Sequence, residues 1–366
     1  MREKSVRRVM VSFFASFMLL SMVCGLVLFI EPASAATYAP NVDGSGKLGG
    51  NEKTVFLEFC MSGAPVNGKH SFYQDVVAFD KALSLATGDR YRCEFYHSEQ
   101  LGTERDYLES VINGTYKSGM IQSTMIGNYL PDFHVLSFPL VYESWDHFWD
   151  VIAPESPIAQ DLLAQLESIG LHGVMFGITG EYQFVNGKHP ILHPSDFAGV
   201  KMRVLESPVL LSTIEAFGGQ AINMNWGEVY TSLQQKTIDG VAALNLATYV
   251  TKLNEVCKYL TEIHIYDIPN VVIFNLKWWN GLPKEDQDLI TRAIQSTFLY
   301  VKADYFEQDA NTLNLLESEA GMQVIRRNQL DIAEWRAAVQ PVYDEYEKQY
   351  GGWLKRIADM APSKKK

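Results

Sequence analysis

The sequence is poor in the residues that cross-link or metallate small secreted domains. Its 366 residues include four cysteines, and the three beyond the N-terminal region are Cys60, Cys93 and Cys257. Their wide spacing matches neither a disulfide framework nor a zinc site. We expect three separate core thiols, although an oxidising compartment would permit a disulfide between two of them. No metal site and no cofactor is predicted.

Motifs that mark common enzyme classes are missing too. The sequence contains no H-E-x-x-H, G-x-S-x-G or P-loop pattern. Its histidines lie at no telling distance from an acid or a cysteine; they include His97, His134, His147, His172, His189, His193 and His264. We therefore predict no catalytic residues. The alternative is a hydrolytic enzyme whose triad assembles only in the folded chain.

Positive charge is also scarce. The chain has 31 Lys and Arg against 43 Asp and Glu, a net charge of -12. The first 35 residues hold a net +2, so the remainder carries -14. Such an acidic body repels nucleic acid and anionic membranes, which excludes both as partners. An anionic small molecule remains compatible, because a local cationic pocket can oppose the overall sign.

The N-terminus has the pattern of an export signal. A basic segment from Arg2 to Arg8 precedes an uncharged stretch from Val9 to Ile30, and Pro32 and the small residues Ala33–Ala35 follow. This order predicts a signal peptide over residues 1–35 and a periplasmic protein. Because the apolar stretch is long enough to span a bilayer, a retained anchor is the alternative.

Beyond a glycine-rich, flexible lead-in over residues 36–51, strand and helix patterns alternate. Strands are expected at residues 55–60, 91–96, 120–124, 173–179, 201–205, 221–224, 240–245 and 270–279. Helices are expected at 70–86, after the caps Thr103 and Ser144, and at 157–170. Alternation of this kind predicts an α/β fold in which helices flank the sheets. The length of the chain suits two domains.

Two further helix signals bear on the fold. Thr103 with Asp106 and Asn225 with Glu228 each have the spacing of a capping box. A helical pattern then runs almost unbroken from residue 283 to residue 319, which is roughly 55 Å of helix. We expect such a helix to cross both domains or to kink.

An ordered series of short motifs runs through about two-thirds of the chain. They are Gln100–Gly102 with Glu104, Leu108–Glu109, Gly114–Thr115, Pro131, Phe138–Tyr142, His193–Val204, Met224, Glu228–Tyr230, Leu233–Gln235, Asp239–Gly240, Glu255–Leu260 and Leu282–Pro283. Each motif alone is weak, but the ordered series is specific. It resembles the solute receptors of TRAP transporters, the DctP-type periplasmic binding family.

The resemblance implies a two-lobed, type II-like binding-protein fold, in which each lobe is a mixed sheet flanked by helices and a long helix spans both. The expected division is residues 52–179 plus 268–307 for lobe I and 180–267 plus 308–366 for lobe II. It also implies hinge closure around a small organic acid and delivery to membrane permease subunits driven by an ion gradient. A monomer or a dimer is expected. An ABC-type or signalling receptor is the alternative among binding proteins.

Arg203 is the central candidate for ligand binding. It ends a short apolar strand and precedes a helix, a position from which a side chain can project into a cleft between lobes. The resemblance implies that this arginine clamps the ligand carboxylate, and the planar guanidinium suits two parallel hydrogen bonds. The alternative is a surface arginine paired with Glu206 or Asp196.

The sequence departs from the family pattern at several further positions. A second arginine of the family is replaced by Tyr182, and an acidic position of some members by Gln122. The usual Glu-Asn pair falls on Ala242 and Ala243, which leaves Asn245 as a displaced amide. Each of these candidate side chains could instead serve packing.

The remaining candidates suggest a less polar ligand. Trp226 could form an apolar wall, Ser62 ends the first strand, and Glu206 could meet a ligand ammonium or simply be a solvated acid at a helix start. Lower positive charge and more apolar surface favour a monocarboxylate, an aromatic acid or an amino-substituted acid over a dicarboxylate.

Overall fold

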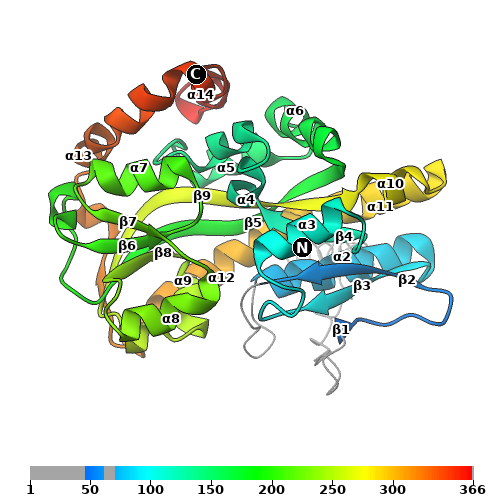
Figure 1. Ribbon diagram of the computed structural model, residues 1–366, viewed down its shortest axis with the longest axis horizontal. Helices are drawn as coiled ribbons and strands as arrows, with labels where there is room; N and C mark the ends of the chain where they lie inside the picture. The colour runs from blue at the N-terminus through cyan, green and yellow to red at the C-terminus, as the bar shows by residue number, and fades with distance from the viewer. Residues whose placement is uncertain (1–45, 62–70, 365–366) are drawn as a thin grey trace, which may run out of the picture. The chain divides into compact units, whose positions relative to one another are not determined.

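The computed structural model describes residues 46–61 and 71–364 (Figure 1). The predicted signal peptide, most of the predicted lead-in and the candidate Ser62 lie outside the described residues. Within them, no helix is both long and apolar enough to cross a membrane. The thiols of Cys60, Cys93 and Cys257 are buried and free, as expected for core residues.

Strands and helices alternate along the described chain. The strands are β1 (Gly46–Lys47), β2 (Val55–Cys60), β3 (Tyr91–Tyr96), β4 (Ser118–Gln122), β5 (Leu171–Asn186), β6 (Lys201–Val204), β7 (Gln220–Asn223), β8 (Gly240–Ala243), β9 (Tyr259–Asn275) and β10 (Gln323–Ile325). The helices are α2 (Ser71–Thr87), α3 (Glu104–Ile112), α4 (Ser123–Gly127), α5 (Trp145–Ile152), α6 (Pro157–Gln165), α7 (Pro208–Ala216), α8 (Trp226–Gln234), α9 (Asn245–Val250), α10 (Leu276–Asn280), α11 (Lys284–Gln295), α12 (Phe298–Ser318), α13 (Ile332–Ala338) and α14 (Gln340–Asp359). The predicted α/β class is confirmed.

The strands form two mixed sheets. The smaller has the order β1-β3-β2, and the larger has the order β10-β9-β5-β8-β6-β7, with β4 paired to β9. Neighbours are parallel within β2–β3 and within β8–β6–β7, but β5 and β9 pair antiparallel along almost their whole length. Parallel neighbours require helical crossovers, and these place helices on both faces of the larger sheet (Figure 1).

The long strands β5 and β9 join two separate regions of the hydrophobic core. At one end, Phe176 and Ile273 pack into a cluster with β2, β3 and α2, whereas at the other Phe184 and Ile263 pack into a cluster around Trp335. A third cluster, which includes Leu260, lies beneath α8 and the end of α12. β5 and β9 therefore connect these two regions of the core.

The predicted strands at 173–179 and 270–279 were wrong in extent, because β5 and β9 are 16 and 17 residues long. Polar residues such as Glu181 and His264 interrupt their apolar pattern in the middle. The β5–β9 register also shifts at three places, two of them between Ile178 and Phe184. Such bulges break the two-residue alternation from which strands are recognised.

The long helical pattern is realised as α11 and α12, with a break at Ser296 and Thr297. The hydroxyls of these two residues donate to the carbonyls of Ala293 and Ile294, a competition with backbone bonding that bends helices. Beyond the break, α12 contributes Val301 to the first core cluster, and its far end contributes to the third. The expectation that this helical pattern crosses both domains or kinks is met by the break.

Of the two predicted capping boxes, one is present. The Thr103 hydroxyl accepts from the Asp106 N–H and the Asp106 carboxylate accepts from the Thr103 N–H. The second prediction was wrong: Asn225 is the N-cap of α8, but its side chain caps no N–H there. The C-terminal helix α14 packs with the first core cluster, through residues such as Val342 and Ile357.

Candidate functional site

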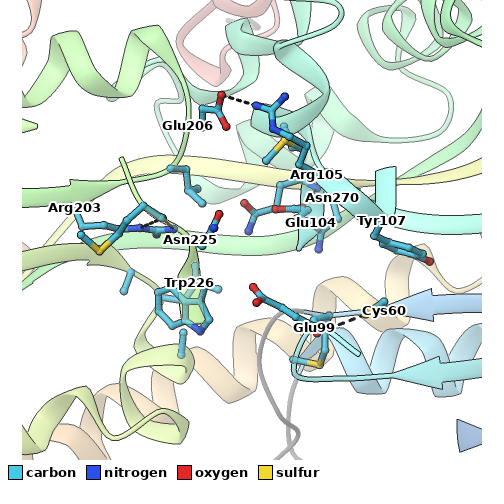
Figure 2. A pocket seen from close by; sticks show the side chains of 18 of the residues that line it. Cys60, Glu99, Glu104, Arg105, Tyr107, Arg203, Glu206, Asn225, Trp226 and Asn270 are labelled. Carbon is cyan, nitrogen blue, oxygen red and sulfur yellow. Dashed lines mark hydrogen bonds and ion pairs between the residues drawn. The ribbon is translucent and has the colours of Figure 1, made fainter. Parts of the chain in front are cut away.

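A cavity of about 150 Å³ opens between two groups of elements (Figure 2). One group is the β3–α3 connection with α3 and β4, and the other comprises β6 and the β7–α8 connection. The predicted site residues that line it are Arg203, Trp226, Tyr182, Gln122 and Glu206. Five side chains distant in sequence therefore meet at one place.

Arg203 is held at the inner end of the cavity by the sheet. Its strand, β6, lies between β7 and β8, and the residue is 3% exposed. Nε and Nη2 donate to the carbonyl of Met224, at 3.1 and 2.9 Å, and the guanidinium carbon lies 5.5 Å from the ring centroid of Trp226. Nη1 is buried and has no partner among the described residues.

No carboxylate among the described residues forms an ion pair with this guanidinium. Glu206 pairs with Arg105 instead, and Asp196 accepts from the N–H groups of Leu192 and His193. Burial lowers the pKa of Arg203 to about 10, although the nearby Tyr182 and Glu104 oppose the shift. The alternative of a surface arginine paired with Glu206 or Asp196 is therefore wrong. Arg203 is a desolvated cation in the cavity, and its Nη1 has no acceptor among the described residues.

The opposite wall carries hydrogen-bond acceptors. Glu99 and Glu104 enter from the β3–α3 connection and α3, facing Arg203 across the cavity (Figure 2). Glu104 accepts from the Gln122 N–H at 2.7 Å. Burial raises the pKa of Glu104 to about 7, against the lowering effects of this N–H and of the charge of Arg203. The wall therefore contains a carboxyl group that titrates near neutral pH.

Gln122 and Tyr182 connect the two walls. Gln122 Nε2 donates to the Tyr182 hydroxyl at 3.1 Å, while Gln122 Oε1 is buried and has no partner among the described residues. Burial raises the pKa of Tyr182, so its phenol stays protonated and can act as a donor. Cross-strand pairing places Asn270 of β9 opposite Gln122, and it lines the cavity too.

Four methionines contribute to the apolar surface of the cavity. Met61, Met120, Met125 and Met224 line it together with Trp226. Their side chains are flexible and polarizable, and they adapt to ligands of irregular shape. The apolar wall predicted from Trp226 is therefore larger than one indole ring.

Glu206 occupies the edge of the cavity. Its Oε1 accepts from Arg105 Nη2 of α3 at 2.5 Å, and both side chains are about two-fifths exposed. Because the carboxylate already has a cationic partner, it is a weaker candidate for a ligand ammonium than Glu99 or Glu104.

Asn245 lies elsewhere. It begins α9, is fully buried and is absent from the lining of the cavity. Its Nδ2 donates to both carboxylate oxygens of Asp309 on α12, at 3.1 and 3.0 Å. The sequence interpretation missed Glu99 and Glu104, although Glu104 lies within the motif that begins at Gln100.

The chemistry of the cavity suits binding. Cys60 is the lining residue closest in kind to a nucleophile, but burial raises the pKa of its thiol to about 11, so the thiolate is scarce at neutral pH. No group of three or more metal-ligating side chains of His, Cys, Asp or Glu occurs in the described part of the chain. A buried cation facing acceptors over an apolar floor can hold an anionic organic molecule in one orientation.

Comparison with known proteins agrees with this geometry. Residues 63–349 match the family model of the bacterial extracellular solute-binding proteins, family 7 (DctP). A solute-binding protein of Verminephrobacter eiseniae is 31% identical over 274 residues, which cover 75% of this chain and 80% of that protein.

Two solved structures of TRAP periplasmic solute-binding proteins superimpose well. One, from Polaromonas and bound to D-erythronate, is 28% identical with a TM-score of 0.77, covering 84% of this chain and 98% of that one. The other, from Bordetella with ligand density assigned to pantoate, is 26% identical with a TM-score of 0.77, covering 84% and 99%. The chain therefore belongs to family 7 of the bacterial extracellular solute-binding proteins and is a periplasmic solute receptor with a type II binding-protein fold, not an enzyme.

Proposed function

We propose that the protein binds a small hydroxylated or amino-substituted monocarboxylate and delivers it to the membrane subunits of a TRAP transporter. The observation that carries the proposal is the state of Arg203. Its guanidinium is desolvated, has no carboxylate partner among the described residues and keeps Nη1 free. A ligand carboxylate that bonds Nη1 would supply the missing counter-charge.

The wall opposite Arg203 supports a single carboxylate on the ligand. Glu99 and Glu104 lie where a second carboxylate of an extended diacid would point, and like charges in a partly buried site repel. A hydroxyl or ammonium group would instead donate to Glu104. The position at which the family often carries a second arginine is Tyr182, which offers a phenol and no positive charge.

The ligands of two relatives are compatible with this chemistry. The Polaromonas protein binds D-erythronate, and the density in the Bordetella protein was assigned to pantoate. Both molecules have one carboxylate and several hydroxyl groups, and pantoate adds an apolar body that methionines could contact. We infer that the ligand of this chain belongs to the same class.

Capture requires the cavity to open and close. We propose that β5 and β9 are the hinge, because they run between the core regions and their register shifts near Gly180. The proposed lobes are residues 52–179 plus 268–307 and residues 180–267 plus 308–366. The packing of α14 on the first core cluster would tie the C-terminal segment to lobe I as well.

The test is isothermal titration calorimetry of the purified periplasmic protein with matched acids. D-erythronate and pantoate represent hydroxylated monocarboxylates, β-alanine an amino-substituted one, butyrate a plain one and succinate a dicarboxylate. We expect the first group or β-alanine to bind at least about tenfold more tightly than butyrate or succinate, since a hydrogen bond to a charged group contributes roughly 1.5–3 kcal/mol.

Tightest binding of succinate would contradict the proposed ligand class while leaving the carboxylate clamp intact. If no acid in the panel produced heat, the role of Arg203 itself would be refuted. Small-angle scattering with saturating ligand tests the hinge separately, and an unchanged radius of gyration would refute closure.

A further inference from the structure

A second cavity lies on the opposite face of the hinge strands. Tyr182 lines the first cavity, whereas its neighbour Glu181 lines the second. Successive side chains of a strand point to opposite faces, so the β5–β9 ribbon separates the two cavities. The second one has a volume of about 430 Å³ and is bounded by β5, β9 and α12, with Trp145 of α5 at its wall.

Carboxylates outnumber cations around this cavity. Glu181, Glu262 and Asp309 line it, and Asp267 lies directly opposite Glu181 in the β5–β9 pairing, hence on the same face of the ribbon. His264 lies between two of these acids, with Nδ1 3.0 Å from Glu181 and Nε2 3.7 Å from Glu262. One imidazolium therefore serves two carboxylates.

The two arginines nearby are already engaged. Arg326 forms an ion pair with Glu317 of α12, and the guanidinium of Arg327 donates to the carbonyl of Ile263. The Arg327 backbone N–H donates to Glu262 at 3.1 Å. These contacts leave Asp267 and Asp309 without a cation of their own among the described residues.

Two buried acceptors beside this cavity have no partner in the described chain. One is Oδ1 of Asp267, whose side chain is on the Glu181 face and whose residue is 9% exposed. The other is Oδ1 of Asn245, a fully buried residue whose Nδ2 bonds Asp309. Both are acceptors on residues that lie beside the cavity without lining it, and an unpaired buried acceptor calls for a donor. Nε1 of Trp145, in the cavity wall, is an unpaired donor.

Aromatic rings form the rest of the wall. Trp145 and Tyr305 lie with ring centroids 5.2 Å apart, and Phe306 of α12 is 64% exposed beside them. Carboxylates next to aromatic faces are the combination that attracts organic ammonium ions. A bare metal ion is a poorer fit, because no three ligating side chains of His, Cys, Asp or Glu converge among the described residues.

We propose that this second cavity binds a small organic ammonium ion. The ammonium group would lie near Glu181 and Asp309, with its carbon substituents against Trp145 and Tyr305. Binding of the ammonium ion does not require the proposed acid ligand, because the two cavities lie on opposite faces of the ribbon.

Binding there is expected to be linked to closure, and this part of the inference rests on the proposed function. The Glu181 N–H donates to the Tyr305 hydroxyl at 3.0 Å, and that hydroxyl donates to Asp309 at 3.2 Å, so α12 is bonded to the hinge strand. At Gly180, whose φ is +128°, a Cβ would lie 1.9 Å from the same hydroxyl. A hinge motion that closes the first cavity, here called the front cavity, must also change the distance between α12 and the hinge strands at the second cavity. An ammonium ion would favour the conformation that fits it better.

The test is calorimetric titration of the purified protein with tetramethylammonium and with putrescine, each against potassium chloride at matched ionic strength. We expect saturable binding of at least one, weakened fivefold or more by Asp309→Asn and by Trp145→Leu. Glu104→Gln is the matched control, because it removes a carboxylate from the front cavity alone, and it should change the affinity less than twofold. Circular dichroism confirms that each variant is folded.

Three outcomes would overturn the site. They are no saturable binding of either ion, equal binding by Asp309→Asn, and loss of binding in Glu104→Gln, which would place the ammonium in the front cavity. Repeating the titration with saturating acid tests the linkage: unchanged affinity removes the coupling but leaves the site.

Discussion

On the front face of the β5–β9 ribbon, Tyr182 borders a cavity whose buried guanidinium lacks a carboxylate partner among the described residues, whereas on the back face Glu181 borders a cavity in which carboxylates exceed cations. On the front face, the charge without a partner belongs to one residue, Arg203. The imbalance behind is spread over Glu181, Asp267 and Asp309 and partly relieved by His264.

Arg203 is therefore a single group available for a ligand, whereas Glu181, Asp267 and Asp309 belong to a network of charged groups. A single desolvated cation with one unused donor destabilises the empty protein and is relieved only by a ligand. Several acids that share His264 instead redistribute their charge by taking up protons, because burial raises the pKa of both Asp267 and Asp309. Substitutions on the front face should therefore mainly change ligand affinity. Substitutions on the back face should mainly change how stability depends on pH.

The largest effect is expected from Arg203→Met. The affinity for the best monocarboxylate should fall at least about a hundredfold, because removal of one partner of a buried charge pair costs roughly 2–5 kcal/mol. The empty protein should melt at the same or a higher temperature, since methionine removes a desolvated charge from a site without a counter-ion. Calorimetry measures the first quantity and differential scanning fluorimetry the second.

Arg105→Met is the matched control. It removes a partly exposed arginine whose partner is Glu206, and it should cost far less affinity. A large drop in the melting temperature of empty Arg203→Met would assign Arg203 to the architecture of lobe II and undo the contrast between the faces.

A second effect, of about tenfold, is expected at Glu104. Burial raises its pKa to about 7, so the group is a carboxylate above that pH and a neutral acid below it. A ligand that donates to the carboxylate should bind most tightly above pH 7 and lose affinity as pH falls through 7. Glu104→Gln should bind about tenfold more weakly at pH 8 and lose the pH dependence between 6 and 8.

For succinate, the expected pH dependence of the affinity has the opposite sign. A second ligand carboxylate is repelled by ionised Glu104, so its affinity should rise as pH falls, and Glu104→Gln should improve it at pH 8. If both ligands followed the same pH profile, Glu104 would not face the ligand.

The sequence predicted the front site far better than the back one. Arg203 and Trp226 lie in or beside motifs with recognisable order, and Tyr182 and Gln122 were found as departures from those motifs. Glu104 was overlooked because its motif also caps α3, which already accounts for an acid at that helix start. Asn245 was predicted as a displaced substitute for the Glu-Asn pair of the family, but α9 begins there and its amide donates to Asp309.

The back cavity could not be predicted from local pattern. Glu181 and Asp267 are 86 positions apart and become neighbours only through the β5–β9 register, which the bulges near Gly180 shift. Asp309 reaches the same place because α12 lies across β5 after the break at Ser296. These three charged residues become buried together only through contacts between distant parts of the chain. Such contacts produce no periodic pattern in the sequence.

A third, smaller effect concerns stability on the back face. Burial and the charge of Glu181 raise the pKa of Asp309 to about 7, above its value of about 4 in an unfolded chain. The folded state therefore binds an additional proton between these values, and stability falls as pH rises from 4 through 7. Asp309→Asn should therefore gain more stability over the parent at pH 8 than at pH 5 in urea denaturation, because the parent loses stability across that interval.

The neighbouring groups define the control for that measurement. His264, Glu181, Asp267 and Tyr305 all face Asp309. His264 stays charged across this range, because the hydrogen bonds that it donates to Glu181 and Glu262 outweigh its burial and raise its pKa to about 10. Glu104 also has a pKa raised to about 7, so Glu104→Gln alone should remove its own part of the pH dependence. The gain from Asp309→Asn should persist in a Glu104→Gln background, because the two sites lie on opposite faces of the ribbon. Equal gains for Asp309→Asn at both pH values would mean that the carboxylate is solvated.

The smallest effect is expected at the edge of the front cavity, at Glu206. Its ion pair with Arg105 is partly exposed on both sides, and such pairs contribute about 0.2–1 kcal/mol. Glu206→Gln should therefore change the affinity for a hydroxylated monocarboxylate less than about threefold, with the change fading at high salt. A tenfold loss confined to β-alanine would show instead that Glu206 leaves Arg105 to meet a ligand ammonium. The acid that orients the ligand would then be Glu206 at the mouth and not Glu104 on the inner wall, and the front face would bind its ligand with a mobile carboxylate.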